Sequence, residues 1–311
     1  MRILVTGGAG FIASHVTEGF IAAGHEVAVL DNLITGFRKN IPPEAKFFEG
    51  DIRDIEFVRS VFDEFKPEAV DHHAAQMDVR KSLDDPIFDA HTNILGSINL
   101  IQNAVRVKVK KFIYISTGGA VYGEPQWLPV MENHEIRPEC AYGISKHTVE
   151  HYLELYRLLE GLPYTVLRYP NVFGPRQNPH GEAGVNAIFI GLMLAGKQPV
   201  IYGDGEQLRD YTYVSDIVNA NCLALERGEG EIVNIGSGIG TSVNTIYECL
   251  ADIIHFPRPA DYQPARKGEI EKIFLDARKA KAVLGWEPKV SFREGLEKTV
   301  EWSKQQLLRQ A

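Results

Sequence analysis

The sequence predicts an α/β protein in which a doubly wound parallel sheet carries a smaller C-terminal lobe. Strand-like and helix-like segments alternate through the first half of the chain, which is typical of a parallel sheet with helices on both faces. After about Asn171 the elements become shorter, and glycine and proline become frequent, as at Gly174, Pro175, Pro179, Gly181 and Gly184. We therefore expect two domains, residues 1–170 and residues 171–311.

The elements of the first half follow from the spacing of apolar residues. We expect strands at residues 2–6, 26–30, 46–49, 69–71, 111–116 and 163–168, and helices at 11–23, 55–65, 96–107 and 141–159. Residues 231–237 begin with another strand-like run. We expect this segment to return to the main sheet, which makes the boundary between the two domains irregular.

The charge balance restricts the classes of partner. The chain of 311 residues has 33 Lys and Arg against 41 Asp and Glu, a net charge of −8, which argues against wholesale binding to nucleic acid or to anionic membranes. No apolar stretch approaches the ~20 residues of a membrane span. The three cysteines show no zinc spacing. We expect a cytoplasmic protein with no metal site.

A glycine-rich segment between the first strand and the first helix has the context of a dinucleotide-binding loop. Gly7 allows a sharp turn, and Gly10 lets backbone N–H groups approach a pyrophosphate where Phe11 and Ile12 open the helix. Asp31 ends the second strand. A carboxylate there accepts hydrogen bonds from the adenosine ribose and repels a 2′-phosphate, so the pattern favours NAD over NADP.

Further cofactor contacts are expected where the next strands end. Asn32 follows Asp31, and Asp51 with Ile52 follows the third strand, where they are expected to border the adenine. Asp51 can equally be a turn residue. Ala74 and Ala75 are small enough to let the backbone approach NAD. The two histidines before them face opposite ways on a strand, so they do not predict a metal site.

Tyr142 and Lys146 have the spacing of a tyrosine–lysine pair on one face of a helix. A free phenol has a pKa of about 10 and is a poor base at neutral pH. A neighbouring ammonium favours the phenolate and lowers that pKa. A phenol tuned in this way can take a proton from a sugar hydroxyl and later return it. We therefore predict that Tyr142 is the catalytic acid and base.

Together these motifs resemble the extended short-chain dehydrogenase/reductase family, a group with a Rossmann fold. The resemblance covers nearly the whole chain and is greatest to the nucleotide-sugar-modifying members, in particular the bacterial and archaeal UDP-glucose 4-epimerases. It implies NAD as the cofactor, with Ser116 and Tyr169 beside it. Its further motifs are Ser116–Gly123 (STGGAVYG), Leu167-Arg168-Tyr169, Gly203-Asp204-Gly205, Arg209-Asp210-Tyr211 and Leu284-Gly285-Trp286.

The segment after the fifth strand separates the chemistries of this family. Related dehydratases place an Asp-Glu pair just after the threonine, whereas this chain has Gly118-Gly119. The resemblance therefore implies 4-epimerisation through a transient 4-keto sugar. Many epimerases carry a catalytic Ser or Thr where this chain has Gly118. Thr117 is the best replacement, and Ser116 is a second candidate.

The resemblance also implies where the UDP-sugar binds. Asn171 matches a residue that contacts the nucleotide sugar, and Val200 with Tyr202 matches the strand that flanks the uracil. Two arginines are expected to grip the diphosphate with paired donors, and one acid to bind the uridine ribose. These are Arg209, Arg266 and Glu269.

Alternatives remain for the substrate and the assembly. Ile273 matches a position where a bulky residue can exclude an N-acetyl group, so UDP-N-acetylhexosamines and UDP-glucuronate are the alternative substrates. A dehydratase or reductase with net redox change is a further alternative, as is a non-catalytic NAD sensor. The family usually forms homodimers through two long helices, which correspond here to residues near 98–107 and 141–159.

Overall fold

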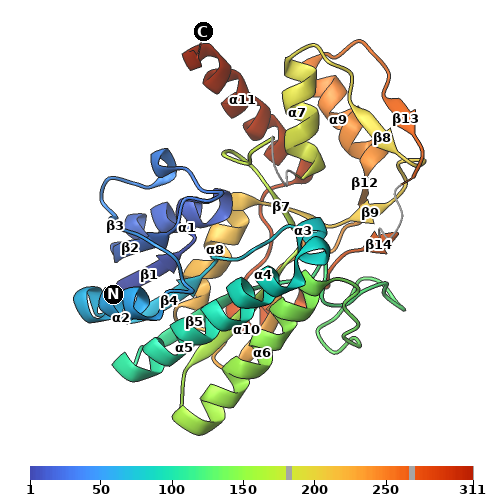
Figure 1. Ribbon diagram of the computed structural model, residues 1–311. Helices are drawn as coiled ribbons and strands as arrows, with labels where there is room; N and C mark the ends of the chain where they lie inside the picture. Colours follow the sequence, from blue (N-terminus) through green and yellow to red (C-terminus); the bar gives the residue numbers. More distant parts are fainter. Residues whose placement is uncertain (180–183, 266–269, 311) are drawn as a thin grey trace.

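Seven parallel strands form the main sheet of the computed structural model, which describes residues 1–179, 184–265 and 270–310 (Figure 1). The strands are β1 (Arg2–Thr6), β2 (Glu26–Asp31), β3 (Lys46–Glu49), β4 (Ala69–His72), β5 (Lys111–Thr117), β6 (Tyr164–Tyr169) and β11 (Glu231–Asn234). Their order is β11-β6-β5-β4-β1-β2-β3. The chain reverses its winding direction between β1 and β4, which lie side by side, and such a switch point is where open α/β sheets bind ligands. The predicted fold class is confirmed.

Successive residues of a strand point to opposite faces of the sheet, and both faces here carry apolar side chains. Helices therefore cover both faces. Ile3 and Val5 of β1 belong to one core, which α1 (Phe11–Ala22) and α8 (Val214–Ala224) cover. Leu4 belongs to the other core, beneath three further helices: α2 (Ile55–Phe65), α5 (Gly96–Val107) and α6 (Ala141–Glu160). With both faces covered by helices, a ligand can approach the sheet at the carboxyl ends of its strands.

The helix ends follow from local sequence. Asp54 precedes α2 and accepts a hydrogen bond from the backbone N–H of Phe57, which satisfies one of the free donors of the first turn. Gly161 ends α6 at φ +68°, a left-handed conformation that glycine adopts without a side-chain clash. Between β4 and α5 the chain forms three short turns of helix: α3 (Val79–Asp84), α4 (Pro86–Ala90) and the π-helix η2 (His91–Leu95). A single 3-10 turn, η1 (Arg38–Asn40), follows β2.

A second group of elements lies beyond the carboxyl ends of the sheet (Figure 1). It contains the helices α7 (Val185–Leu194), α9 (Val243–Ile254) and α11 (Phe292–Gln310). Its small sheets pair β8 (Val200–Tyr202) with β13 (Asp261–Gln263), β9 (Leu208–Arg209) with β12 (Thr241–Ser242) and β14 (Lys272–Ile273), and β7 (Asn171–Phe173) with β10 (Tyr211–Tyr213). The division of the chain into domains at residue 170 stays a prediction. Three elements after that point, α8, β11 and α10 (Arg278–Leu284), pack on or beside the main sheet.

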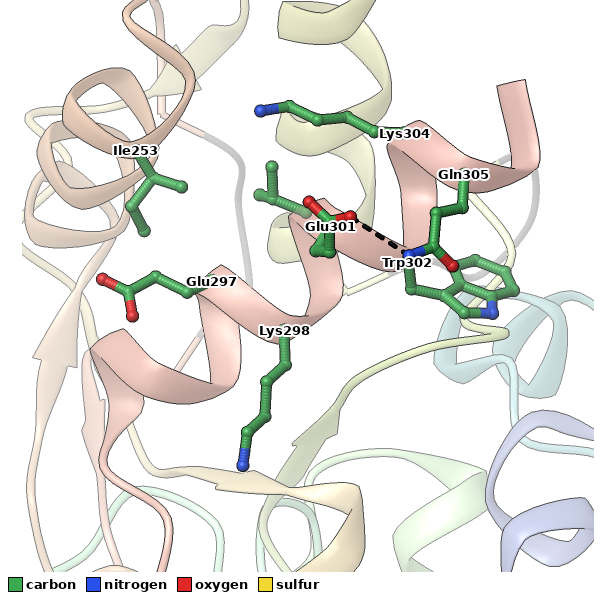
Figure 2. A pocket seen from close by; sticks show the side chains of 8 residues that line it. Ile253, Glu297, Lys298, Glu301, Trp302, Lys304 and Gln305 are labelled. Carbon is green, nitrogen blue, oxygen red and sulfur yellow. Dashed lines mark hydrogen bonds between the residues drawn. The ribbon is translucent and has the colours of Figure 1, made fainter. Parts of the chain in front are cut away.

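The outer end of this group has a hollow of about 560 Å³ along α11, with Ile253 of α9 on its other side (Figure 2). Its α11 wall carries charged side chains, and Glu301 accepts a hydrogen bond from Gln305 at 3.1 Å. In Figure 1 α11 projects away from α6, so this hollow lies apart from the tyrosine–lysine pair. Within the described residues, no helix is both long and apolar enough to cross a membrane.

Candidate active site

The glycine loop joins β1 to α1 in direct contact with the end of β4. Gly7 has φ +73°, and a Cβ atom there would lie 2.8 Å from the backbone nitrogen of Ala74. A side chain at Gly7 would therefore fill the switch point of the sheet. Gly10 precedes α1 and has no side chain that could cap the helix. The N-cap residue therefore gives the first backbone N–H groups of α1 no side-chain acceptor. Such a helix start binds a pyrophosphate.

Asp31 lies at the end of β2, directly beside this loop. Its two carboxylate oxygens accept backbone hydrogen bonds from Ala9 at 3.0 Å and from Leu33 at 2.8 Å. Burial raises the pKa of Asp31, and these two hydrogen bonds act in the opposite direction. Each oxygen keeps capacity for a second hydrogen bond, so the carboxylate can still accept from a ribose hydroxyl. The loop and Asp31 together fit the predicted dinucleotide.

The residues predicted to border the adenine lie in two environments. The Asn32 side chain donates to Asp51 at 2.9 Å, and Arg53 binds the same carboxylate through two nitrogens. The hydrogen bond from Arg53 lowers the pKa of Asp51 to about 2. Ile52 has its side chain buried against Gly96. The adenine contacts of these residues stay predictions.

The adjacent histidines at the end of β4 point in different directions. His72 is fully buried between the hydroxyls of Thr6, at 2.7 Å, and Ser97, at 2.8 Å, and burial lowers its pKa well below the usual value. His73 lies 2.9 Å from the Asp71 carboxylate. No group of three potential metal ligands occurs among the residues that the structure describes. His72 therefore connects β1, β4 and α5 inside the protein.

The first turn of α6 is fixed closely against the loop that follows β5. The Sγ atom of Cys140 accepts from the backbone N–H of Gly143, and a Cβ atom at Gly143 would lie 2.6 Å from the carbonyl oxygen of Ala120. The backbone N–H of Tyr142 donates to Ser82 on α3 at 3.1 Å. The half-buried Tyr142 is therefore positioned by contacts on both sides of its backbone.

Lys146 lies one turn further along α6 and is 3% exposed. Its Nζ atom lies 4.2 Å from the centre of the Tyr114 ring on β5. Burial lowers the pKa of Lys146 to about 7, although the negative charges of Glu150 and Asp89 act to raise it. Tyr142 and Lys146 thus lie one turn apart on α6, with the lysine side chain inside the protein.

A buried ion pair lies behind Lys146 and was not predicted from the sequence. Glu150 accepts from Ser116 at 2.6 Å and forms two hydrogen bonds with Arg168, at 3.0 and 2.5 Å. Burial opposes ionisation of Glu150, but hydrogen bonds from His147 and Arg168 outweigh it and lower its pKa to about 2. The position of Glu150 one turn after Lys146 is the signal that could have indicated it.

The hydroxyl of Ser116 is thus directed toward Glu150, whereas Thr117 is the last residue of β5 and half-buried. A side chain at position 118 would meet Leu275. A Cβ atom on Gly118 would lie 2.4 Å from Cδ1 of Leu275, whereas one on Gly119 would meet only the Thr117 hydroxyl, at 3.8 Å. Thr117 is therefore the better of the two predicted candidates. No local sequence pattern predicted the contact with Leu275.

The two residues predicted at the end of β6 and just after it, Tyr169 and Asn171, differ in exposure. Tyr169 is 4% exposed, and its hydroxyl accepts a hydrogen bond from Asn221 on α8 at 2.5 Å. Asn171 begins β7 and is exposed, and its backbone N–H donates to Asp210 at 3.0 Å. Their ligand contacts stay predictions.

The predicted UDP contacts lie on the small sheets. Val200 and Tyr202 are half-buried on β8. Arg209 on β9 donates to the backbone carbonyls of Leu208, at 3.0 Å, and Glu271, at 3.2 Å. Ile273 pairs with Arg209 across β9 and β14 and is buried, 3% exposed. The remaining predicted residues lie outside the described residues, namely Arg266 and Glu269.

A polar hollow of about 540 Å³ adjoins the start of α6. It is lined by Glu124, Arg137, Pro138 and Glu139. Pro138 contacts the first turn of α6, since its Cβ atom lies 3.0 Å from where a Cβ atom on Gly143 would stand. The Glu124 carboxylate accepts from the backbone N–H of Glu271 at 3.0 Å. The hollow thus lies between the first turn of α6 and the residue that precedes β14.

Comparisons with known proteins agree with this geometry. Residues 3–236 match the NAD dependent epimerase/dehydratase family. The UDP-glucose 4-epimerase of Thermotoga maritima, solved with UDP-glucose, is 50% identical with a TM-score of 0.97, covering 99% of this chain and 100% of its own. The Thermus thermophilus UDP-glucose 4-epimerase, solved with NAD, is 44% identical with a TM-score of 0.93, covering 98% and 99%. The UDP-glucose 4-epimerase of Mycolicibacterium smegmatis is 40% identical over 97% of this chain and 98% of its own.

The contact between Gly118 and Leu275 gives a stability prediction. Gly118→Ser overpacks this site and should lower the free energy of unfolding by about 1–3 kcal/mol. Combined with Leu275→Ala, the serine should cost less than it does alone, because the smaller side chain makes room for it. Denaturant unfolding of the four proteins in this cycle measures the coupling. Gly119→Ser is the matched control and should change stability by less than about 0.5 kcal/mol. Equal costs for the two serine variants would contradict the prediction.

The pKa of Lys146 gives a pH prediction. In the unfolded chain a lysine titrates near 10.4, whereas in the folded protein burial lowers the pKa of Lys146 to about 7. Between these values the unfolded state binds more protons, so this group makes the protein more stable as pH rises. Compared with Lys146→Met, the wild type freed of nucleotide should gain up to about 1.4 kcal/mol per pH unit from pH 7 to 10. Denaturant unfolding across that range checks this, and parallel profiles would refute it.

Proposed function

Because this chain belongs to the NAD-dependent epimerase/dehydratase family, we propose that it interconverts UDP-glucose and UDP-galactose by epimerisation at C4 of the sugar. One observation carries this proposal within the family. Lys146 is buried on the face of α6 that also bears Tyr142, while no carboxylate follows Thr117. An acid–base pair of this kind serves epimerisation and lacks the groups that dehydration requires.

The residues around the switch point would hold the cofactor. The start of α1 at Gly10 would bind the pyrophosphate, and Asp31 would accept from the adenosine ribose. Asp31 near the 2′-hydroxyl disfavours a 2′-phosphate, which supports NAD. When bound, NAD supplies the acceptor for the hydrogen on C4 and returns it within the same turnover, so the reaction has no net redox change.

Tyr142 would move the proton. Its phenolate takes the proton from the O4 hydroxyl as C4 is oxidised and gives it back when C4 is reduced on the other face. In its protonated form Lys146 would stabilise the phenolate by its positive charge. Thr117 would donate or accept a hydrogen bond at O4 and orient the sugar. The O4 proton and the C4 hydride both return to the sugar. The product therefore differs from the substrate only in the configuration at C4.

The site also bears on the alternative substrates. A dehydratase would need an acid and a base for C5 and C6, yet positions 118 and 119 are both glycine, and a Cβ atom at position 118 would lie 2.4 Å from Leu275. UDP-glucuronate and UDP-N-acetylhexosamines remain the alternative substrates for 4-epimerisation. We propose Asn171, Val200, Tyr202, Arg209, Arg266 and Glu269 as the residues that bind the UDP-sugar.

We also propose that the protein works as a homodimer in the cytoplasm. Several apolar side chains are exposed on the outer surface of α4, η2 and α6. Ile87 is 71% exposed, Leu95 53%, Leu155 45% and Leu158 67%. Burial of such a patch against a second copy would remove apolar surface from water. The free thiols of Cys140, Cys222 and Cys249 are typical of a reducing compartment.

The catalytic proposal is tested with UDP-galactose and no added cofactor. The purified protein should form UDP-glucose, which NMR or chromatography identifies, because NAD retained from expression suffices. Tyr142→Phe should lower kcat by about 10²–10⁴-fold, since the proton acceptor is lost. UDP binding, measured by calorimetry, should stay unchanged. If the wild type converts neither UDP-sugar even after addition of NAD, the proposed substrates are wrong.

The dimer is tested by sedimentation. Leu155→Glu combined with Leu158→Glu should shift the protein from dimer to monomer, because two charges cannot be buried without partners. Leu308→Glu is the control, since Leu308 is 79% exposed and belongs to α11, a helix that projects away from α6 in Figure 1. A wild type that sediments as a monomer, or a double variant that remains dimeric, contradicts this assembly.

A further inference from the structure

A group of hydrogen bonds connects helix α1 to the loop that follows β7. Arg176 in that loop donates to the Ser14 hydroxyl at 3.1 Å and also to the Glu18 carboxylate. On the same helix, Nε2 of His15 lies 2.9 Å from the backbone carbonyl of Pro175, which can only accept, so Nε2 carries the proton. We call these five residues the α1–β7 clasp. It joins segments that are 158–162 residues apart in the sequence.

Most of the clasp is sheltered from solvent. The side chains of His15 and Arg176 are 17% and 21% exposed, and that of Glu18 is 44% exposed. An isolated surface ion pair contributes little to stability. Here, however, one guanidinium has two partners on one face of a helix, because Ser14 and Glu18 are one turn apart. The clasp therefore fixes the guanidinium more closely than a single exposed ion pair would.

The backbone of Arg176 is also unusual. Its φ angle is +72°, in the left-handed region that residues other than glycine seldom adopt. A strained conformation of this kind persists only where the surrounding structure holds it. The hydrogen bonds to Ser14 and Glu18 are the contacts that hold Arg176. The loop thus adopts a locally unfavourable conformation that brings a guanidinium onto α1.

Each end of the clasp adjoins one part of the proposed site. The His15 ring meets the ring of Phe11, the first residue of α1, edge-on at 6.0 Å. On the other side, β7 begins at Asn171, and Gln177 of the loop donates back to the Val172 carbonyl at 3.2 Å. The clasp therefore lies between the helix whose start would bind the NAD pyrophosphate and the strand that carries a proposed UDP-sugar ligand.

We propose that Arg176 is a positioning residue that holds β7 in place relative to α1, so that NAD bound at the start of α1 orders the strand that carries Asn171. A first ligand that makes a protein more rigid lowers the ordering cost for a second ligand. The clasp gives this effect a direct route from one side of the site to the other. The consequence for the sugar rests on the proposed function, since it uses the proposed role of Asn171.

Hydrogen exchange of backbone amides, measured with and without saturating NAD, tests the clasp and requires no turnover. In the wild type, NAD should slow exchange in β7 and in residues 174–177. Coupling between two sites typically amounts to about 5–150-fold, so Glu18→Ala should reduce this NAD effect at least about 5-fold. This substitution lies on α1 and leaves the sequence of the loop intact. Arg176→Gly should have the same effect without added strain, because glycine adopts φ +72° readily.

A double variant and a control make the result specific to the clasp. Glu18→Ala and Arg176→Gly act through one contact, so together they should reduce the NAD effect no more than Arg176→Gly does alone. Arg106→Ala is the matched control, since it removes an ion pair with Asp63 on the other face of the sheet, and it should leave the NAD effect unchanged. An NAD effect on β7 that is absent in the wild type, or equal in the wild type and Glu18→Ala, would overturn the proposal.

Kinetic measurements separate this inference from the proposed function. Glu18→Ala should raise the KM for UDP-galactose at least about 5-fold and leave kcat close to the wild-type value, because Tyr142 and Lys146 keep their places on α6. A fall in kcat at unchanged KM would contradict the positioning role. A wild type without turnover contradicts the proposed function, and the exchange measurement still decides the clasp because it needs only NAD.

Discussion

The buried ion pair between Glu150 and Arg168 links elements that are far apart in the sequence. Glu150 lies on α6 and binds Ser116 of β5, while Arg168 lies on β6 and donates to the hydroxyl of Tyr122 at 2.7 Å. Tyr122 in turn donates to Asn234 on β11 at 2.8 Å. One polar cluster thus joins three strands, a helix and the loop after β5. Because removal of one partner of such a pair typically costs about 3–5 kcal/mol, the position of the tyrosine–lysine pair depends on this cluster.

Regular periodicity made the first half of the fold predictable. The strands and helices from Arg2 to Tyr169 have strong apolar spacing and clear end signals, such as Asp54 before α2 and Gly161 after α6. The short helices α3 and α4 and the π-helix η2 were not predicted. Their sequences are too short to show a period, and they are held by long-range polar contacts. Asn93, for example, donates to the Gln76 carbonyl at 2.9 Å and to Ser145 at 3.1 Å.

The candidate site also contains residues that the sequence predicts and residues that it does not. Gly7, Asp31, Tyr142 and Lys146 could be identified because each sits at a fixed place relative to a strand or a helix turn. Leu275 could not, since it reaches Gly118 only through the fold of the second group of elements. Its backbone N–H donates to Asp210 at 3.0 Å, and Asp210 also binds Ser237 at 2.8 Å and Gly238 at 3.1 Å. This buried carboxylate sets the position of Leu275, and the Arg209-Asp210-Tyr211 motif does not indicate that Leu275 lies against Gly118.

The contact between Gly118 and Leu275 also restricts how such a site can change during evolution. A hydroxyl-bearing residue at position 118 costs stability unless position 275 has first accepted a smaller side chain, and that smaller side chain by itself leaves a cavity where Leu275 now packs. The two positions are therefore epistatic. Among related chains we expect them to covary, with glycine at the first wherever a branched aliphatic residue occupies the second. The proposed hydroxyl of Thr117 does not have that dependence, because Thr117 belongs to the end of β5 and not to the loop that contacts Leu275.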